Sequence, residues 1–199
     1  MSWEVAIESD HDLVERLKAG DPAAFDAVYA AHHARLFSFL VRLSRNRQVA
    51  EDLVEETWVR LVSRAGRLRA DTHLAAWLFT VARNLYLSYC RSRLVEESHI
   101  PALMGLWPAG ARRPSPFEAT AATEFERRLE AGLAALPLPY REVLLLVGVE
   151  GLRPAEAAAV CGISPEALRQ RLSRARALLR QQLDPEVEVR HPVFGEVTP

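Results

Sequence analysis

A proline-rich segment in the middle of the chain limits the folds that are open to it. The stretch "PALMGLWPAGARRPSPFE", residues 101–118, holds four of the twelve prolines. Proline lacks an amide hydrogen and its ring clashes with the preceding helical turn, so no helix continues through this stretch. On both sides apolar residues recur at helical spacing, and no segment shows the sustained two-residue alternation of a strand. The sequence therefore predicts an all-α fold of two small helical domains joined by a Pro-rich linker.

Changes in composition along the chain mark the boundaries of these parts. We expect a first domain over residues 10–94, a linker over 95–118, a second domain over 119–183 and an acidic, flexible tail over 184–199. The linker is not purely polar, because it contains Trp107 among other apolar residues. Such a segment either packs on a domain or binds a partner, and we favour the partner.

The overall charge is close to neutral, with 25 basic and 26 acidic residues. No apolar run approaches the roughly 18 residues that a membrane-spanning helix needs. The N-terminus is acidic and lacks the basic region and apolar core of a signal peptide. Cys90 and Cys161 lie in helical, apolar contexts and are expected to be reduced and largely buried. We therefore expect a cytoplasmic protein without membrane insertion.

Residues 154–183 have the features of a helix-turn-helix. Pro154 opens a short helix that is rich in alanine, and Gly162 follows where a tight turn needs a residue that tolerates positive φ. Ser164 and Pro165 are a typical N-cap and first-turn pair, so a second helix begins at once. A short helix, a glycine turn and a capped second helix indicate this motif.

The second helix of this motif has one apolar stripe and one basic face. Small or amide side chains occupy the centre of the polar face, where they can approach base edges. Arginines flank that centre on both sides, where they can contact phosphates, and a solvated basic face is the alternative interpretation. The central residues are Gln170, Ser173 and Ala177, and the flanking arginines are Arg169, Arg171, Arg174, Arg176 and Arg180.

Two segments of the first domain suggest further contacts. The helix "AEDLVEETWVRL" combines an apolar side with many acids and is a plausible protein-docking surface. The segment "AAWLFTVARNLYLSYCRSR" places aromatic residues beside arginines, a combination that suits unstacked bases and single strands. For each aromatic residue on its own, packing in the core is the alternative.

These segments resemble the extracytoplasmic-function (group IV) sigma factors of bacterial RNA polymerase. "AEDLVEETWVRL" is similar to the polymerase-binding helix of the family, and "WLFTVARNLYLSYCRSR" to its segment for promoter melting and minus-ten recognition. "LPLPYREVLLLVGVEGLRPAEAAAVCGISPEALRQRLSRARALLR" is similar to its minus-thirty-five domain. The resemblance implies a region 2-like helical bundle and a region 4-like helix-turn-helix domain. It also implies an alternative sigma factor that directs core polymerase to specific promoters, in a stress or signal response.

The resemblance assigns site residues by position. The loop Leu68–His73 would hold a flipped base of the minus-ten element. The residues expected to contact the β and β′ subunits of polymerase are Asp52, Glu55, Glu56 and Trp58. Those expected at the minus-ten element are Trp77, Arg83 and Asn84. Those expected at the minus-thirty-five element are Pro165, Glu166, Arg169, Gln170, Arg171 and Arg174.

Other classes of protein fit less well. A helix-turn-helix regulator that acts without polymerase is the main alternative, with N-terminal helices that dimerise or sense a ligand. An all-helical enzyme is weaker, because the six histidines form no metal pattern and we find neither a Gly-rich phosphate loop nor a nucleophile–base pair. We therefore expect no catalytic residues, no metal and no cofactor. The expected partners are core RNA polymerase, promoter DNA and an anti-sigma factor.

Overall fold

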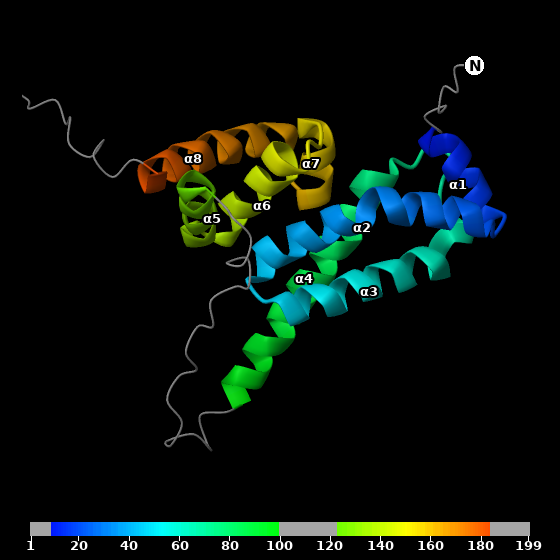
Figure 1. Cartoon of the computed structure of the whole chain (residues 1–199), viewed down its shortest axis with the longest axis horizontal. Coiled ribbons are helices and arrows are strands. Elements are labelled where there is room, and N and C mark those ends of the chain that lie inside the picture. The colour runs from blue at the N-terminus through cyan, green and yellow to red at the C-terminus, as the bar shows by residue number, and fades with distance from the viewer. Residues whose placement is uncertain (1–8, 100–122, 184–199) are drawn as a thin grey trace, which may run out of the picture.

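Helices account for every regular element in residues 9–99 and 123–183, which are the residues that the computed structural model describes (Figure 1). This confirms the all-α fold. In the first half the elements are α1 (Asp10–Lys18), α2 (Pro22–Ser44), α3 (Arg47–Arg64), the short 3₁₀ helix η1 (Ala65–Arg67) and α4 (Leu74–His99). In the second half they are α5 (Glu124–Ala135), α6 (Leu138–Leu144), the π-helical turn η4 (Leu145–Val149), α7 (Pro154–Cys161) and α8 (Pro165–Leu183).

Helix α4 continues to His99, beyond residue 94, at which the first domain was expected to end. The domain boundaries therefore stay predictions. Most of the expected linker, including its apolar residues, and the acidic tail lie outside the described residues. No helix in the described ranges is both long and apolar enough to cross a membrane.

Local side-chain chemistry sets the ends of several helices. The Asp21 carboxylate accepts a hydrogen bond from the amide of Ala23 at 2.9 Å, and Pro22 occupies the first position of α2. Helix α7 ends at Gly162, whose φ of 65° is the left-handed conformation that the sequence predicted there. The Ser164 hydroxyl then accepts from the amide of Ala167 at 3.1 Å, so α8 begins directly after the turn.

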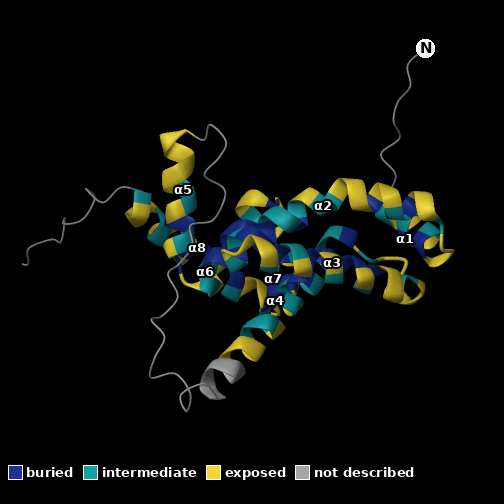
Figure 2. Cartoon of the chain, turned by 60° about the horizontal axis from the view of Figure 1, so that its bottom comes forward, coloured by how far each residue is buried: buried dark blue, intermediate teal, exposed yellow. Residues whose placement is uncertain are grey.

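The core of the first half forms where α2, α3 and α4 pack on one another. Phe39 of α2 and Phe79 of α4 are fully buried and meet edge to face, with ring centroids 5.2 Å apart. Figure 2 shows the buried residues concentrated between these helices, with exposed residues on their outer faces. The amphipathic pattern of each helix therefore decides which side faces its neighbours.

In the second half, α8 packs along α6 and crosses α7. Ala157 and Ala158 of α7 are buried, and their small side chains let α7 approach α8 closely. Leu168 and Ala175 are the fully buried residues on the inner face of α8. The helix-turn-helix predicted from the sequence is therefore present, with the predicted stripe facing the core.

The two halves are packed against each other. Helix α4 lies against α7, and α2 contacts α5 and α6 (Figure 1). The guanidinium of Arg141 in α6 donates hydrogen bonds to the carbonyl oxygens of Leu133, Leu136 and, across the boundary, Leu43 of α2. One cation thereby satisfies the carbonyl groups at the C-terminal ends of helices from both halves.

Ion pairs between arginines of the first half and glutamates of the second half cross the same boundary. The arginines belong to α2 and α4, and the glutamates belong to the segment from α5 onward. Two of these glutamate side chains, those of Glu142 and Glu150, are only 3% and 4% exposed. The pairs are Arg35 with Glu150 at 3.2 Å, Arg42 with Glu130 at 2.8 Å, and Arg83 with Glu142 at 2.9 Å.

Candidate nucleic-acid interface

Helix α8 presents the predicted basic face to solvent. Leu168, Leu172 and Ala175 anchor the opposite side of the helix in the core. Because these residues are three or four positions apart, they line one side of the helix, and the opposite side points outward. The candidate minus-thirty-five residues that are exposed are Pro165, Glu166, Arg169, Gln170 and Arg174.

One acid lies within this basic face. Glu166 accepts a hydrogen bond from Arg169 at 2.7 Å, and both side chains are 67% exposed. An ion pair so open to water is weak, so Arg169 remains able to exchange this partner for a phosphate. The first turn of α8 is therefore less basic than the turns around Arg174 and Arg180.

Arg171 differs from the other arginines of α8. Its side chain is only 28% exposed, and Nη1 lies 3.5 Å from Oε1 of Glu142 on α6. The side chain therefore points toward the boundary between the two halves and away from the open face. In this conformation Arg171 does not reach a DNA groove that faces the outer side of α8.

Arg83 of α4 is bound to the same carboxylate. Its Nε donates to Oε2 of Glu142 at 2.9 Å and its Nη2 donates to Oε1 at 3.2 Å. Burial disfavours the charge on Arg83, but the hydrogen bond and the attraction from Glu142 outweigh it, so the pKa of Arg83 is raised. The buried Glu142 carboxylate therefore binds both Arg83, a candidate minus-ten residue, and Arg171, a candidate minus-thirty-five residue.

Cys161 lies beside this charged cluster. Burial and the nearby Glu142 carboxylate raise the pKa of its thiol to about 12. The thiol is therefore protonated at neutral pH and is a poor nucleophile. Cys161 and the half-buried Cys90 are both free thiols.

The other candidate minus-ten residues differ in exposure. Asn84 is exposed, and Trp77 is partly buried against the core. Of the neighbouring aromatics, Phe79 is fully buried and Tyr86 is 9% exposed, so core packing is the correct interpretation for those two. The aromatic pattern alone could not separate these cases, because core packing and base stacking both use aromatic rings.

The loop between α3 and α4 is mostly exposed. Leu68 anchors its beginning at 7% exposure, and Leu74 anchors its end at 0%. Between them Arg69 pairs with Asp71 through two hydrogen bonds, at 2.9 and 3.1 Å. The loop is thus anchored at its two ends by the buried Leu68 and Leu74, while residues 69–71 between them are exposed.

The candidate polymerase-binding residues of α3 lie on two sides of the helix. Asp52 and Glu55 are exposed, and Glu56 is partly exposed and pairs with Arg60 at 2.7 Å. Trp58 is different, because it is only 6% exposed.

Trp58 joins α3 to α2. Its indole Nε1 donates to Nδ1 of His33 at 3.2 Å, and its ring meets Phe25 edge to face with centroids 5.8 Å apart. It therefore stabilises the surface on α3 from beneath and is not available to a partner in this conformation.

Sequence reasoning missed two residues of the α3 surface. Val59 and Val62 are 59% and 64% exposed. They lie four and seven positions after Glu55, so the three residues share one face. The signal was available, because both valines fall outside the apolar stripe that packs in the core.

Metal binding has no structural support in the part of the chain that the structure describes. No group of three or more histidine, cysteine, aspartate or glutamate side chains there could hold a metal ion. What the surfaces offer instead is an exposed acidic and apolar face on α3 and an exposed basic face on α8.

Comparisons with known proteins identify both halves. Residues 28–94 match the family described as Sigma-70 region 2, and residues 126–179 match Sigma-70, region 4. The chain is 37% identical over 144 residues to the ECF RNA polymerase sigma factor EcfG of Rhodopseudomonas palustris (strain TIE-1), covering 72% of this chain and 76% of that protein. It is 33% identical over 182 residues to the RNA polymerase sigma factor CarQ of Myxococcus xanthus, covering 88% and 99%.

A solved structure shares the arrangement of helices. It is the sigma factor RpoE in complex with the anti-sigma factor NepR from Bartonella quintana, with a TM-score of 0.62 and 28% sequence identity. The match covers 83% of this chain and 98% of that chain.

Proposed function

Because the chain belongs to the extracytoplasmic-function (ECF) RNA polymerase sigma factors, we propose that α3 docks on core polymerase while α4 and α8 recognise the two promoter elements. The chain is an alternative sigma factor that directs RNA polymerase to promoters. It acts by binding rather than by catalysis, and it works in the cytoplasm, where polymerase meets DNA.

One observation carries this assignment of surfaces. A single chain exposes two different faces, an acidic and apolar one on α3 in the first half and a basic one on α8 in the second half. A regulator that acts without polymerase needs only the second face. A face that is made of Asp52, Glu55, Val59 and Val62 would repel DNA phosphates and suits a protein partner.

Minus-thirty-five recognition is assigned to the outer face of α8. Gln170 lies at the centre of this face, where it can reach base edges, and Arg169 and Arg174 lie beside it, where they can reach phosphates. Pro165 and Glu166 lie at the entry of the helix and would contact the edge of the site. Arg171 joins this set only after its side chain leaves Glu142.

Minus-ten recognition is assigned to α4 and the loop before it. Asn84 is exposed, and the loop Leu68–His73 has an open middle that can receive an unstacked base. Trp77 supports this region from the partly buried side of α4. Arg83 would contact DNA only after it leaves Glu142.

The packed conformation therefore does not present the complete promoter surface. Glu142 binds Arg83 and Arg171 at once, and it is 3% exposed. Arg83 becomes available when α4 separates from α6 and α7, whereas Arg171 lies in the same half as Glu142 and must leave that carboxylate in a step of its own. In this assignment polymerase binding stabilises the separated arrangement, because the α3 face and the promoter-binding faces are then engaged together.

Regulation by an anti-sigma factor is part of the proposal. The related RpoE of Bartonella quintana forms a complex with the anti-sigma factor NepR. An anti-sigma factor that covers the exposed Val59 and Val62 would compete directly with polymerase for α3. Co-purification of a small protein that is displaced by core polymerase would support this part, and its failure to compete would contradict it.

In vitro run-off transcription tests the main assignment. Core polymerase, the full chain and fragmented genomic DNA are combined, and the start sites are mapped. We expect a shared pair of sequence elements upstream of those sites, with the spacing that two DNA-binding faces on one protein impose. Specific DNA binding by the chain alone, with no retention of core polymerase in a pull-down, would instead favour the regulator that acts without polymerase.

A further inference from the structure

Helix α1 lies outside the segment that matches Sigma-70 region 2, which begins at residue 28. It is nevertheless well anchored. Val14 is fully buried and Leu17 is 5% exposed, and the Ser9 hydroxyl accepts from the amide of Asp12 at 3.2 Å. α1 contacts both α2 and the short helix η1 that precedes the loop Leu68–His73. It is therefore a fixed support beside that loop.

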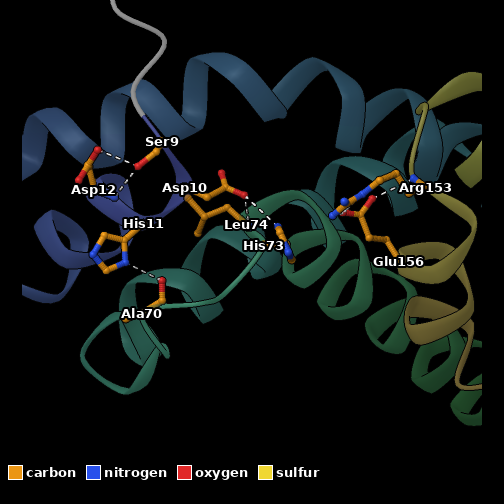
Figure 3. Close-up of polar contacts among 9 residues, drawn as sticks. All are labelled: Ser9, Asp10, His11, Asp12, Ala70, His73, Leu74, Arg153 and Glu156. Atoms are coloured by element: carbon orange, nitrogen blue, oxygen red, sulfur yellow. Dashed lines mark hydrogen bonds and ion pairs between the residues drawn. The ribbon is translucent and has the colours of Figure 1, made fainter.

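Two side chains of α1 bind the loop and the helix that follows it (Figure 3). The Asp10 carboxylate accepts a hydrogen bond from the backbone amide of Leu74, the first residue of α4, at 3.2 Å. The ring of His11 meets the carbonyl oxygen of Ala70 at 3.0 Å through Nδ1, which donates this hydrogen bond. α1 thus holds the loop at its exposed middle and at its end.

The Asp10 carboxylate has a second favourable interaction. It lies at the N-terminus of α4, where the helix dipole attracts negative charge. His73, the last residue of the loop, has Nδ1 3.7 Å from the same carboxylate. The cap for α4 therefore comes from another helix, and this fixes where the loop must end.

The loop has few other anchors along its open part. Arg69 and Asp71 pair with each other, an interaction that lies within the loop and does not attach it to the helical bundle. Leu68 and Leu74 fix its two ends in the core. The amide of Thr72 also donates to the carbonyl oxygen of Arg69 at 3.0 Å, which closes a turn around Ala70 within the loop, and the contact from His11 attaches this turn to α1.

We propose that Asp10 and His11 are positioning residues for minus-ten recognition, because they set the backbone conformation of the loop Leu68–His73. This inference rests on the proposed function, which gives that loop its role in binding an unstacked base. The two residues contact the loop and the start of α4, and they need not contact DNA themselves.

The test measures promoter discrimination with the full chain and core polymerase. Run-off transcription is compared on a mapped promoter, on versions with single-base changes in the minus-ten element, and on versions with single-base changes in the minus-thirty-five element. The variants are Asp10→Ala and His11→Ala. Asp10→Asn keeps an acceptor for the amide of Leu74. Glu15→Ala is the matched control, since Glu15 is an acid of α1 that pairs with Lys18 on the same helix.

We expect Asp10→Ala and His11→Ala to reduce discrimination among minus-ten sequences by about two- to thirtyfold, the range that loss of a helix cap corresponds to. Discrimination at the minus-thirty-five element should not change. Glu15→Ala should behave like the unmodified chain, and Asp10→Asn, which keeps the acceptor but loses the charge, should lose less minus-ten discrimination than Asp10→Ala. Unchanged minus-ten discrimination in Asp10→Ala would overturn the inference. So would an equal loss at both elements, because a merely structural effect lowers all recognition together.

A measurement without DNA or polymerase separates this inference from the proposed function. Amide hydrogen exchange at residues 68–74 should be faster in Asp10→Ala than in Glu15→Ala, while exchange in the buried part of α2 stays the same. If the unmodified chain supports no transcription, the proposed function fails, and faster exchange still shows that α1 holds the loop. If exchange at the loop is unchanged, α1 does not set its conformation, whatever the transcription result.

Discussion

Arg83 and Glu142 form a two-point ion pair across the boundary between the two halves, with nitrogen–oxygen distances of 2.9 and 3.2 Å. The two residues are 59 positions apart in the sequence. Arg171 approaches the same carboxylate at 3.5 Å. A single buried acid therefore binds two of the arginines that we propose for promoter recognition.

Neutralising that acid should release both arginines. We expect Glu142→Gln to separate the two halves, because a buried pair that loses one partner is destabilised by about 3–5 kcal/mol. The affinity of the chain alone for promoter DNA should rise about 10- to 150-fold, since a hydrogen bond to a charged group is worth about 1.5–3 kcal/mol. Small-angle scattering measures the separation and fluorescence anisotropy measures the affinity.

The matched control is Glu130→Gln. It removes the same charge from the same boundary, but Glu130 pairs with Arg42, which is not assigned to DNA. If Glu130→Gln raises DNA affinity as much as Glu142→Gln does, the effect is one of net charge, and the role given to Glu142 is wrong.

Arg171 should matter for the minus-thirty-five element once the chain is bound to polymerase. We expect Arg171→Ala to weaken transcription from promoters that depend on this element by about 1–3 kcal/mol if the arginine contacts a base. If it contacts a phosphate, the loss should be similar for all sequences and the salt dependence should decrease by about one unit of slope.

Arg128→Ala provides the comparison for this experiment. Arg128 is 66% exposed on α5 and pairs with Glu124 on its own helix. Its removal should leave promoter output unchanged. Equal output from the Arg171 and Arg128 variants would argue against insertion of α8 into the groove.

The two sides of α3 should respond differently to substitution. We expect Trp58→Ala to reduce the free energy of unfolding by about 3–5 kcal/mol, because it leaves a cavity between α2 and α3. Val59→Ser should change stability by no more than about 0.5 kcal/mol, since that side chain is 59% exposed. Val59→Ser should nevertheless lower the affinity for core polymerase.

Urea denaturation and a core-polymerase binding assay on the same samples separate these effects. A folded Val59→Ser variant that binds polymerase as well as the unmodified chain would remove Val59 from the proposed docking face.

The stability of the chain should depend on pH in opposite directions at two carboxylates. Burial raises the pKa of Glu150, although Arg35 opposes this, so its ionisation costs stability. Its stabilising contribution is present below the ordinary glutamate pKa and is lost as the pH rises through the raised value. The stability of the unmodified chain relative to Glu150→Gln should therefore be greater in acid and should fall as the pH rises towards neutral.

Asp21 should show the reverse. The hydrogen bond from Arg16 and then that from the amide of Ala23 lower the pKa of this partly exposed carboxyl. Its contribution is present above the ordinary aspartate pKa and is lost as the pH falls through the lowered value. Asp21→Asn should be less stable than the unmodified chain at neutral pH and should converge with it in acid. Thermal unfolding from pH 3 to pH 7 checks both, and trends of the same sign would contradict the assignment.

Local features of the sequence predicted much of the fold correctly. The Asp21–Pro22 helix start, the turn at Gly162 and the buried stripe of α8 all appear as expected. The interpretation of the aromatic residues on α4 was less successful, because Phe79 and Tyr86 pack in the core. In the sequence, an aromatic residue that packs in the core looks the same as one that stacks on a base. Only the packing of the neighbouring helices shows which rings are buried.

The sequence by itself determined the helices, the caps that neighbouring residues supply and the outward face of α8, because these depend on residues within about four positions of one another. Only the tertiary structure decided that Trp58 supports the α3 surface from beneath, that Asp10 caps α4, and that Glu142 holds Arg83 and Arg171. These contacts join residues 25 to 64 positions apart. No local pattern encodes them, since they arise only when separate helices bury their apolar faces together.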